Sequence, residues 1–274
     1  MSNSIFKNIS SHKKFVPSKK LGQNFLINNK VCKDLVYLIN DRNFDAIIEV
    51  GPGTGYLTDE LLIFKKPIYL IELDKRLCEF LSKKYSTNKY IHLLNDDILT
   101  CNLNQIIKEY ENPIFVTNLP YSISKPFIIK FLQQSSIKIC YCMLQKEVAE
   151  KLIAQTNTKP YNSFSALTQY YSKTELLIDI DRYNFNPIPK VDSTFVKIIK
   201  NDEQYNIYFA KFIKQIFLAR RKTMLNNLKQ FYYLNTIHDA YNKLKLDKNI
   251  RSEQLTPKEI YNLYLLLQHT KNNV

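Results

Sequence analysis

Glycine is scarce in this sequence, and its placement constrains the fold more than any other feature. The 274 residues contain only four glycines, and Gly51, Gly53 and Gly55 fall within five residues of one another. The apolar run Ala46–Val50 leads directly into them, and the helix-like run Tyr56–Phe64 follows. Glycine adopts positive φ angles easily and lets a backbone approach a ligand closely. The pattern therefore predicts a strand, a tight glycine loop and a helix, with a ligand lying against the loop.

The chain up to about residue 200 alternates between strand-like and helix-like runs. Further strands are expected at Ile68–Glu72, Tyr90–Leu94, Pro113–Thr117, Ile137–Leu144, Leu176–Ile180 and Thr194–Ile199. Helical spacing is found at Val31–Ile39, Arg76–Tyr85, Leu103–Glu109, Lys125–Leu132, Lys146–Ala154 and Phe164–Tyr171. Repeated strand–helix units predict a doubly wound, Rossmann-like parallel α/β sheet. Such sheets bind ligands at the carboxyl ends of their strands, near the point where the strand order reverses.

Three segments are expected along the chain. Residues 1–18 read as a flexible basic arm, because the first 33 residues contain lysines but no acidic residue. Residues 19–200 form the α/β domain. Residues 201–274 are expected to form a small all-helical domain, since only helical patterns follow Asn201. These patterns cover Tyr205–Arg220, Thr223–Tyr232, Thr236–Leu244 and Lys258–His269.

Composition and charge narrow the possible functions. Hydrophobic residues make up 45% and charged residues 23%, which excludes disordered, collagen-like and disulfide-scaffold chains. No apolar run approaches the roughly 18 residues of a membrane span, and none follows the basic N-terminus as a secretory signal would require. Lys and Arg outnumber Asp and Glu by 39 to 25, a net charge of +14. A surplus of this size predicts a polyanionic partner, most often nucleic acid.

Cysteine and histidine give no sign of a metal centre. The five cysteines are scattered, and the four histidines lie far apart without a metal-binding spacing. Cys140 and Cys142 flank Tyr141 at strand spacing and are expected to be buried thiols. We therefore expect no metal site, no disulfide framework and a reducing, cytoplasmic location.

The glycine loop itself indicates the kind of ligand. It reads Glu49-Val50-Gly51-Pro52-Gly53-Thr54-Gly55, whereas a dinucleotide fingerprint GxGxxG would need glycine at Tyr56. The loop thus lacks the space that a pyrophosphate on the helix N-terminus normally occupies. A nucleoside ligand without phosphates, S-adenosylmethionine, fits better. Taken alone, the loop is only slightly better explained by a ligand than by a tight turn.

Two acidic positions strengthen the nucleoside interpretation. Glu72 ends the second strand, 21 residues after Gly51, where a carboxylate can accept two hydrogen bonds from a ribose diol. Asp97 follows the third strand and can accept from an adenine amine while Ile98 packs on the ring. The alternatives are a solvated charge at Glu72 and a helix cap at Asp97.

The motif Asn118-Leu119-Pro120-Tyr121 follows the fourth strand directly and points to the chemistry. The exocyclic amine of adenine is conjugated and a poor nucleophile, so a catalyst must aim its lone pair. The Asn118 side-chain oxygen and the Leu119 carbonyl can accept both amine hydrogens, and Pro120 biases Leu119 towards extended geometry. Tyr121 offers a face on which a flipped-out base can stack. The alternative is a structural turn followed by a core tyrosine.

With these motifs in place, the chain resembles the KsgA-type small-subunit rRNA adenine N6,N6-dimethyltransferases over about Lys19 to Thr256. The motifs that carry the resemblance are Leu21–Leu26, Glu49–Gly55, Asn118–Tyr121, Gln145–Glu147, Phe185–Ser193 and Arg220–Thr223. The chain departs from the family pattern at Thr117, where a smaller residue is usual. It also departs at Tyr161-Asn162-Ser163, where the family element carries Gly or Ser after the tyrosine.

The resemblance implies a fold, an activity and a set of residues. It implies an S-adenosylmethionine-dependent methyltransferase sheet that dimethylates two adjacent adenosines near the 3′ end of 16S rRNA in the 30S subunit. It places Asn24, Leu26, Gly51, Glu72, Asp97 and Asn118 around the methyl donor; the loop chemistry adds Gly53, and the adenine contact adds Ile98. We expect RNA contacts from Lys19, Lys20, Arg220, Arg221 and Lys222, and a monomeric protein.

Three alternatives remain open at this point. The erythromycin-resistance methyltransferases share the fold but act on 23S rRNA. A non-catalytic RNA-binding or transcription factor on the same fold would show decay of Asn118 or of the glycine loop, and both are intact. A nicotinamide-dependent oxidoreductase would need the third glycine of GxGxxG.

Overall fold

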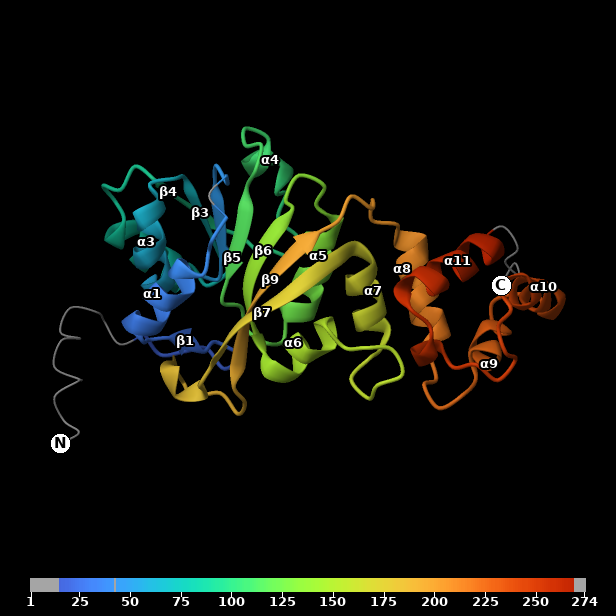
Figure 1. Ribbon diagram of the computed structural model, residues 1–274. Coiled ribbons are helices and arrows are strands. Elements are labelled where there is room, and N and C mark those ends of the chain that lie inside the picture. Colours follow the sequence, from blue (N-terminus) through green and yellow to red (C-terminus); the bar gives the residue numbers. More distant parts are fainter. Residues whose placement is uncertain (1–14, 42, 269–274) are drawn as a thin grey trace.

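A computed structural model describes residues 15–41 and 43–268 and is built around one seven-stranded sheet (Figure 1). The strands lie side by side in the order β4-β3-β2-β5-β6-β9-β7. Their bounds are β2 (Ile47–Val50), β3 (Ile68–Glu72), β4 (Ile91–Asn95), β5 (Ile114–Thr117), β6 (Ile139–Gln145), β7 (Ser172–Ile180) and β9 (Ser193–Lys200). From β2 the chain passes to β3 on one side, while β5 lies on the other. The order therefore reverses at β2.

The expectation of an entirely parallel sheet is wrong at one strand. The first five strands in this order run parallel, but β9 pairs antiparallel with both β6 and β7. A parallel neighbour would need a long crossover, usually a helix, to return the chain to the same end of the sheet. Residues 181–192 contain only the short 3-10 helix η2 (Arg182–Asn184) and the strand β8 (Phe185–Asn186). The chain therefore turns back on itself into β9.

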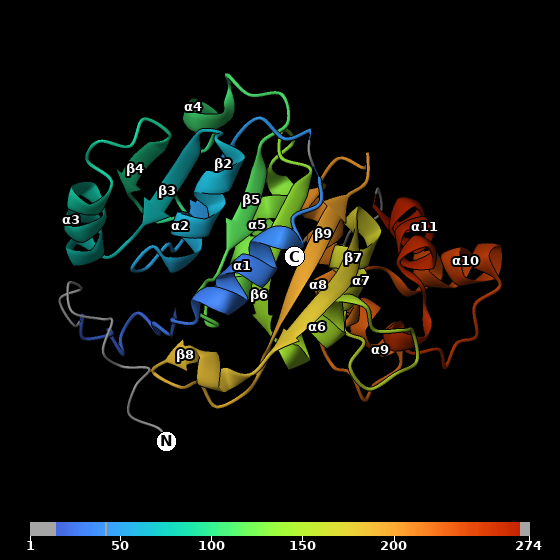
Figure 2. The ribbon, with the colours of Figure 1, turned by 60° about the vertical axis from the view of Figure 1, so that its left-hand side comes forward.

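A second, two-stranded pairing was not foreseen from the sequence. β1 (Phe25–Leu26) pairs antiparallel with β8, so the N-terminal segment is joined to the loop between β7 and β9. Figure 2 shows β8 at the lower edge of the sheet, beside the N-terminal segment. Two-residue strands carry no period-2 pattern long enough to be recognised in a sequence.

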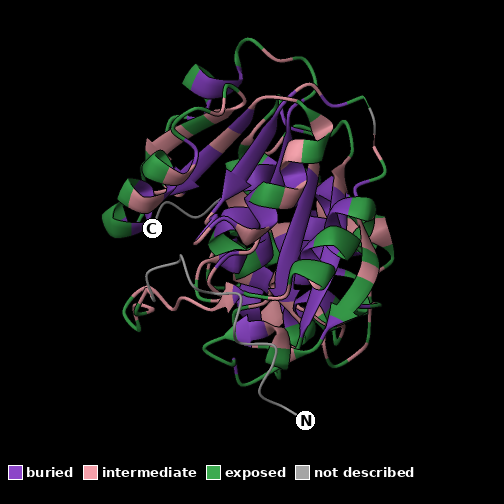
Figure 3. Cartoon of the chain, turned by 90° about the vertical axis from the view of Figure 1, so that its left-hand side faces the viewer, coloured by how far each residue is buried: buried purple, intermediate pink, exposed green. Residues whose placement is uncertain are grey.

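Helices cover both faces of the sheet. Within the sheet domain they are α1 (Asn29–Tyr37), α2 (Tyr56–Leu61), the 3-10 helix η1 (Leu62–Phe64), α3 (Lys75–Lys84), α4 (Asn104–Ile107), α5 (Ser124–Gln133), α6 (Lys146–Leu152) and α7 (Ser163–Tyr171). One buried cluster joins α1, α2 and α3 to one face, and another joins α4, α5, α6 and α7 to the opposite face. Neighbouring Ile47 and Ile48 belong to different clusters, as the alternation of side chains along a strand requires. Figure 3 shows the central strands buried between these layers.

Helix starts follow from local capping chemistry. The side chains of Asn28, Asp74 and Asn162 accept hydrogen bonds from the first-turn N–H groups of α1, α3 and α7. Asn162 has φ of −157°, ordinary extended backbone, so the loop that departs from the family pattern closes without glycine.

The C-terminal helices form a lobe beyond α7 (Figure 1). They are α8 (Ile207–Ile216), α9 (Met224–Leu228), α10 (Leu234–Leu244), the 3-10 helix η3 (Ser252–Gln254) and α11 (Pro257–Leu267). Phe209 of α8 is fully buried and lies within 6.3 Å, between ring centroids, of Tyr170 and Tyr171 of α7 and of Tyr261 and Tyr264 of α11. One hydrophobic cluster therefore runs without a break from the sheet into the helical lobe.

The shared core predicts that the lobe and the sheet unfold together. Phe209→Ala removes the ring at the centre of the junction and should lower the free energy of unfolding by about 3–5 kcal/mol, in one transition. Urea unfolding followed by circular dichroism measures this. Tyr208→Ala, next to it but 60% exposed, is the control and should have a much smaller effect. Two separated transitions would contradict a shared core.

Candidate functional site

A cavity of about 190 Å³ lies where β2, β3 and β5 end, walled on one side by the N-terminal segment. All eight residues expected around the methyl donor line it, as do Leu119 and Pro120 of the expected catalytic motif. The eight are Asn24, Leu26, Gly51, Gly53, Glu72, Asp97, Ile98 and Asn118. The cavity therefore gathers residues from five separate parts of the sequence at the point where the strand order reverses.

The glycine loop approaches its surroundings too closely for side chains. Gly53 has φ of +58°, and a Cβ added there would lie 2.8 Å from Cδ1 of Phe25. A Cβ at Gly51 would lie 3.3 Å from Leu119. The loop thus lies between the N-terminal segment and the motif that follows β5. The backbone on the cavity side stays open to a ligand.

Glu72 holds the loop in place. One of its carboxylate oxygens accepts from the Gly53 N–H at 3.3 Å, and the other accepts from the Asp74 N–H at 2.9 Å. The side chain is 6% exposed, and burial raises the pKa of Glu72 while these two N–H groups partly oppose the rise. Each carboxylate oxygen has a further lone pair, so both remain able to accept from a ribose diol.

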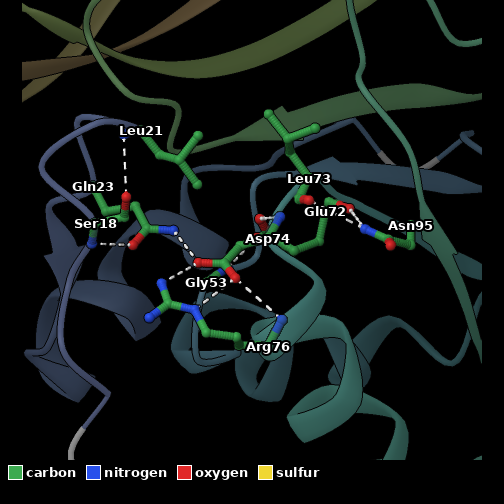
Figure 4. Close-up of polar contacts among 9 residues, drawn as sticks. All are labelled: Ser18, Leu21, Gln23, Gly53, Glu72, Leu73, Asp74, Arg76 and Asn95. Carbon is green, nitrogen blue, oxygen red and sulfur yellow. Dashed lines mark hydrogen bonds and ion pairs between the residues drawn. The ribbon is translucent and has the colours of Figure 1, made fainter.

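Asp74 fastens the N-terminal segment beside the cavity (Figure 4). Its carboxylate receives two bonds from the Arg76 guanidinium, at 3.0 and 2.6 Å, and one from the Gln23 amide at 3.0 Å. The Gln23 oxygen in turn accepts from the Ser18 N–H at 2.7 Å. The Arg76 hydrogen bonds are the main reason that the pKa of Asp74 falls to about 2. We name these four residues the clasp; sequence reasoning missed it, although Gln23 lies inside a recognised motif.

Residues at the end of α3 also hold the glycine loop. The Lys84 ammonium donates to the carbonyl oxygens of Thr54 and Gly55, at 3.2 and 3.3 Å, and forms an ion pair with Asp59 at 2.7 Å. The Tyr85 hydroxyl lies 2.7 Å from the same carboxylate. These contacts orient the start of α2, and their long sequence separation left no local signal.

Asp97 lines the cavity, and its side chain also closes a local turn. Its Oδ1 accepts from the Leu99 N–H at 2.9 Å, and no helix begins there, so the residue is not a helix cap. Its second oxygen is left to accept from a ligand amine. Ile98, 4% exposed, adds an apolar wall beside it.

The motif after β5 presents two acceptors at the cavity. Within the described residues, no hydrogen bond engages the Asn118 amide oxygen or the Leu119 carbonyl. Pro120 is fixed in a turn, because its carbonyl accepts from the Ile123 N–H at 3.1 Å. Tyr121 is half-buried and lies outside the cavity lining, with its hydroxyl 2.8 Å from that of Ser193.

The residues expected to bind RNA differ in their location and in their contacts within the protein. Lys19 and Lys20 are exposed, and Lys20 lines the cavity. Arg220 is committed to the protein, because its guanidinium pairs with Glu253 at 2.7 Å and donates to the Thr158 carbonyl. Arg221 and Lys222 are exposed in the turn after α8. Residues 1–14 of the basic arm lie outside the described residues.

The described residues show no membrane-spanning helix and no metal-binding cluster. In residues 15–41 and 43–268, no helix combines the length and apolar character needed to cross a bilayer. The same ranges contain no group of three or more His, Cys, Asp or Glu side chains arranged to hold a metal ion.

Similarity to known proteins identifies the family of this chain. The model of the family described as ribosomal RNA adenine dimethylase matches residues 15–269. The chain belongs to this family. A small subunit rRNA methyltransferase A from Mycoplasma genitalium is 40% identical over 260 residues, covering 94% of this chain and 99% of that protein. A protein of the same name from Ureaplasma parvum is 38% identical over 274 residues, covering 96% and 98%.

Solved structures support the fold. A dimethyladenosine transferase from Plasmodium falciparum matches with a TM-score of 0.74 at 24% identity, covering 88% of this chain and 96% of that one. The 23S rRNA methyltransferase ErmE matches with a TM-score of 0.66 at 23% identity, covering 89% and 100%. The chain is therefore an rRNA adenine methyltransferase by family, with the Rossmann-like fold that its sequence predicts. The roles of its individual residues remain predictions.

Gly53→Ala should weaken methyl-donor binding sharply. The new Cβ meets Phe25 at 2.8 Å and the backbone is left-handed, a conformation that costs a non-glycine residue about 1–2 kcal/mol before any clash. We expect the dissociation constant for S-adenosylmethionine to rise about 10-fold or more, as measured by calorimetric titration. Gly22→Ala is a matched control, since its φ is +62° but the nearest atom to its Cβ is 3.6 Å away. Equal effects of the two would contradict the close packing against Phe25.

The clasp should make stability depend on pH through Asp74. Its folded pKa of about 2 lies below the ordinary value of 3.8, so the ionised carboxylate stabilises the folded state above about pH 4. Asp74→Asn should therefore lower the free energy of unfolding at neutral pH, and the difference from the unsubstituted protein should shrink as the pH falls from 4 towards 2. Urea titrations at several pH values measure it, with the exposed Asp202→Asn as control. A difference that stays constant down to pH 3 would contradict the role of the clasp.

Proposed function

We propose that this chain transfers methyl groups from S-adenosylmethionine to two adjacent adenosines near the 3′ end of 16S rRNA, giving N6,N6-dimethyladenosines in the 30S subunit. The observation that carries the proposal is a pair of acceptors, the Asn118 amide oxygen and the Leu119 carbonyl, that no described residue engages and that lie beside a cavity suited to a nucleoside. Membership of the rRNA adenine dimethylase family supports the reaction class.

The donor site is proposed residue by residue. Glu72 accepts from the ribose hydroxyls, Asp97 accepts from the adenine amine, and Ile98 packs on the adenine ring. Gly51 and Gly53 allow close approach of the backbone, while Asn24 and Leu26 close the cavity from the N-terminal side. Two observations support the fit of S-adenosylmethionine to this cavity. Gly53 has no room for a Cβ, and the cavity lining combines hydrogen-bond acceptors with apolar side chains.

The residues of the Asn118–Tyr121 motif align the adenine amine with the methyl donor. S-adenosylmethionine provides a methyl group on a sulfonium, an electrophile that needs no metal or catalytic base to activate it. Asn118 and Leu119 accept the two amine hydrogens, so the nitrogen lone pair points towards the donor, and Tyr121 stacks on the base. Alignment of this kind supplies much of the acceleration of a displacement. The product ammonium loses its proton to water.

The substrate follows from charge and from the curated relatives. The net charge of +14 favours a polyanion, and the relatives from Mycoplasma and Ureaplasma are named as small-subunit enzymes. Lys19, Lys20, Arg221 and Lys222 are proposed as phosphate contacts. Arg220 is proposed to contribute by fixing that turn to Glu253. A monomer acting in the cytoplasm completes the proposal.

Labelled S-adenosylmethionine tests the substrate directly. Purified protein should incorporate methyl groups into 16S rRNA of undermethylated 30S subunits, recovered as dimethyladenosine by mass. Subunits that are already dimethylated at these adenosines should accept none. Incorporation into 23S rRNA of 50S subunits instead would favour the erythromycin-resistance type, and binding without methylation would favour a non-catalytic RNA-binding factor.

Asn118→Ala should abolish most methyl transfer while leaving particle binding intact. Loss of one aligning acceptor typically lowers the rate about 10²–10³-fold. Binding should persist, because phosphate contacts elsewhere dominate the affinity. Single-turnover methylation and a filter-binding assay separate the two quantities. Asn112→Ala, exposed in the turn before β5, is the control; a near-normal rate for Asn118→Ala would remove its proposed role.

Removing charge at Arg221 and Lys222 should flatten the salt dependence of RNA binding. Each lost phosphate contact lowers the slope of log K against log salt by about 0.7–0.9. The variant Arg221→Gln/Lys222→Gln should therefore show a slope smaller by up to about 1.8 in magnitude. Lys65→Gln/Lys66→Gln removes equal charge at the amino end of β3, away from the cavity, and serves as control. Identical slopes for the two double variants would refute an RNA contact at the turn.

A further inference from the structure

Tyr121 is held by a residue on a different part of the fold. Its hydroxyl lies 2.8 Å from the hydroxyl of Ser193, with either group able to donate. Ser193 is fully buried at the start of β9, where it pairs with Gln145 of β6 and Ile180 of β7. A half-buried aromatic side chain is thereby fastened at its far end to the first residue of β9, between β6 and β7.

The position of Ser193 is itself fixed by its neighbour. The Asp192 carbonyl accepts from the Lys146 N–H at 3.1 Å, and the Asp192 carboxylate accepts from the Arg182 N–H at 3.1 Å. The segment that reaches Ser193 includes β8, which pairs with β1 at the donor cavity. The hydroxyl of Ser193 is therefore a rigid anchor, and burial raises the pKa of Tyr121.

We propose that Ser193 is a positioning residue for the acceptor adenine, acting through Tyr121. This inference rests on the proposed function, in which the Tyr121 ring stacks on the base. Without the hydrogen bond, the ring would need to be ordered each time a base binds. With it, the stacking face is already in place. Ordering one side chain on binding corresponds to about a 2- to 10-fold change in apparent affinity.

The second methyl transfer is the sensitive step. A monomethylated amine has one hydrogen left for Asn118 or Leu119 to hold, so its orientation depends more on the stacked ring. Loss of the Tyr121–Ser193 bond should therefore slow the second transfer more than the first. Monomethyladenosine should accumulate, whereas donor binding, which occurs on the other side of the motif, should be unchanged.

A double-mutant cycle tests the proposal. Tyr121→Phe, Ser193→Ala and the double variant are compared in single-turnover methylation of undermethylated 30S subunits, with mono- and dimethyladenosine separated by mass. Each single change should slow the second transfer about 2- to 10-fold. The double variant should be no slower than either single variant, because all three lack the same hydrogen bond. Calorimetry should give the same S-adenosylmethionine affinity throughout.

Thr194→Val is the matched control. Thr194 adjoins Ser193, is equally buried, and donates to Asp179 at 2.7 Å. Its loss should affect stability without raising the monomethyl fraction. Additive losses in the cycle, or an unchanged monomethyl fraction in Tyr121→Phe, would overturn the proposal. Tyr121→Phe keeps the ring and decides the matter alone if Ser193→Ala does not fold. An unsubstituted protein that makes no dimethyladenosine would instead overturn the proposed function.

Discussion

The Glu72 carboxylate is the contact on which the donor cavity depends. It accepts from the Gly53 N–H, in the loop after β2, and from the Asp74 N–H, just after β3. It therefore fixes the two cavity walls that follow these strands relative to each other. Asp74, so placed, caps α3 and binds Gln23, which brings the N-terminal segment against the cavity. A carboxylate that is 6% exposed tolerates burial because backbone N–H groups satisfy it.

The site occupies the reversal of strand order for a physical reason. β2 lies between β3 and β5, and the connections from these strands leave in opposite directions, so a crevice opens at their carboxyl ends. The glycine loop lines this crevice, at positions where a side chain would collide with its neighbours. Glu72 and Asn118 stand on its two sides. Donor and acceptor residues thus meet although they are distant in sequence.

Local patterns predicted much of the fold and of the cavity. The expected strand Ile68–Glu72 matches β3 at both ends, and the residues expected around the donor do meet at one cavity. These features leave strong local marks: apolar runs of strand length, glycine where φ is positive, and acidic or amide side chains directly after strands. β9 was wrongly expected to run parallel to its neighbours, whereas it runs antiparallel to both. The signal was present, because no helical run separates it from β7.

The features that the sequence did not predict depend on contacts between residues far apart in the chain. The pairing of β1 with β8, the bond from Gln23 to Asp74, the pairing of Arg220 with Glu253 and the contact of Tyr121 with Ser193 all join distant segments. No local period encodes such a partner. A basic cluster predicted an RNA contact at Arg220, and no local pattern showed that this guanidinium also pairs with Glu253 within the protein.

A crystal structure of this protein with S-adenosylmethionine tests the central claim most directly. The account predicts the ribose at Glu72, the adenine between Asp97 and Ile98, and the methyl group facing the Asn118 amide oxygen and the Leu119 carbonyl. A donor bound outside this cavity, or one bound in it with the methyl group turned away from Asn118, would contradict the account.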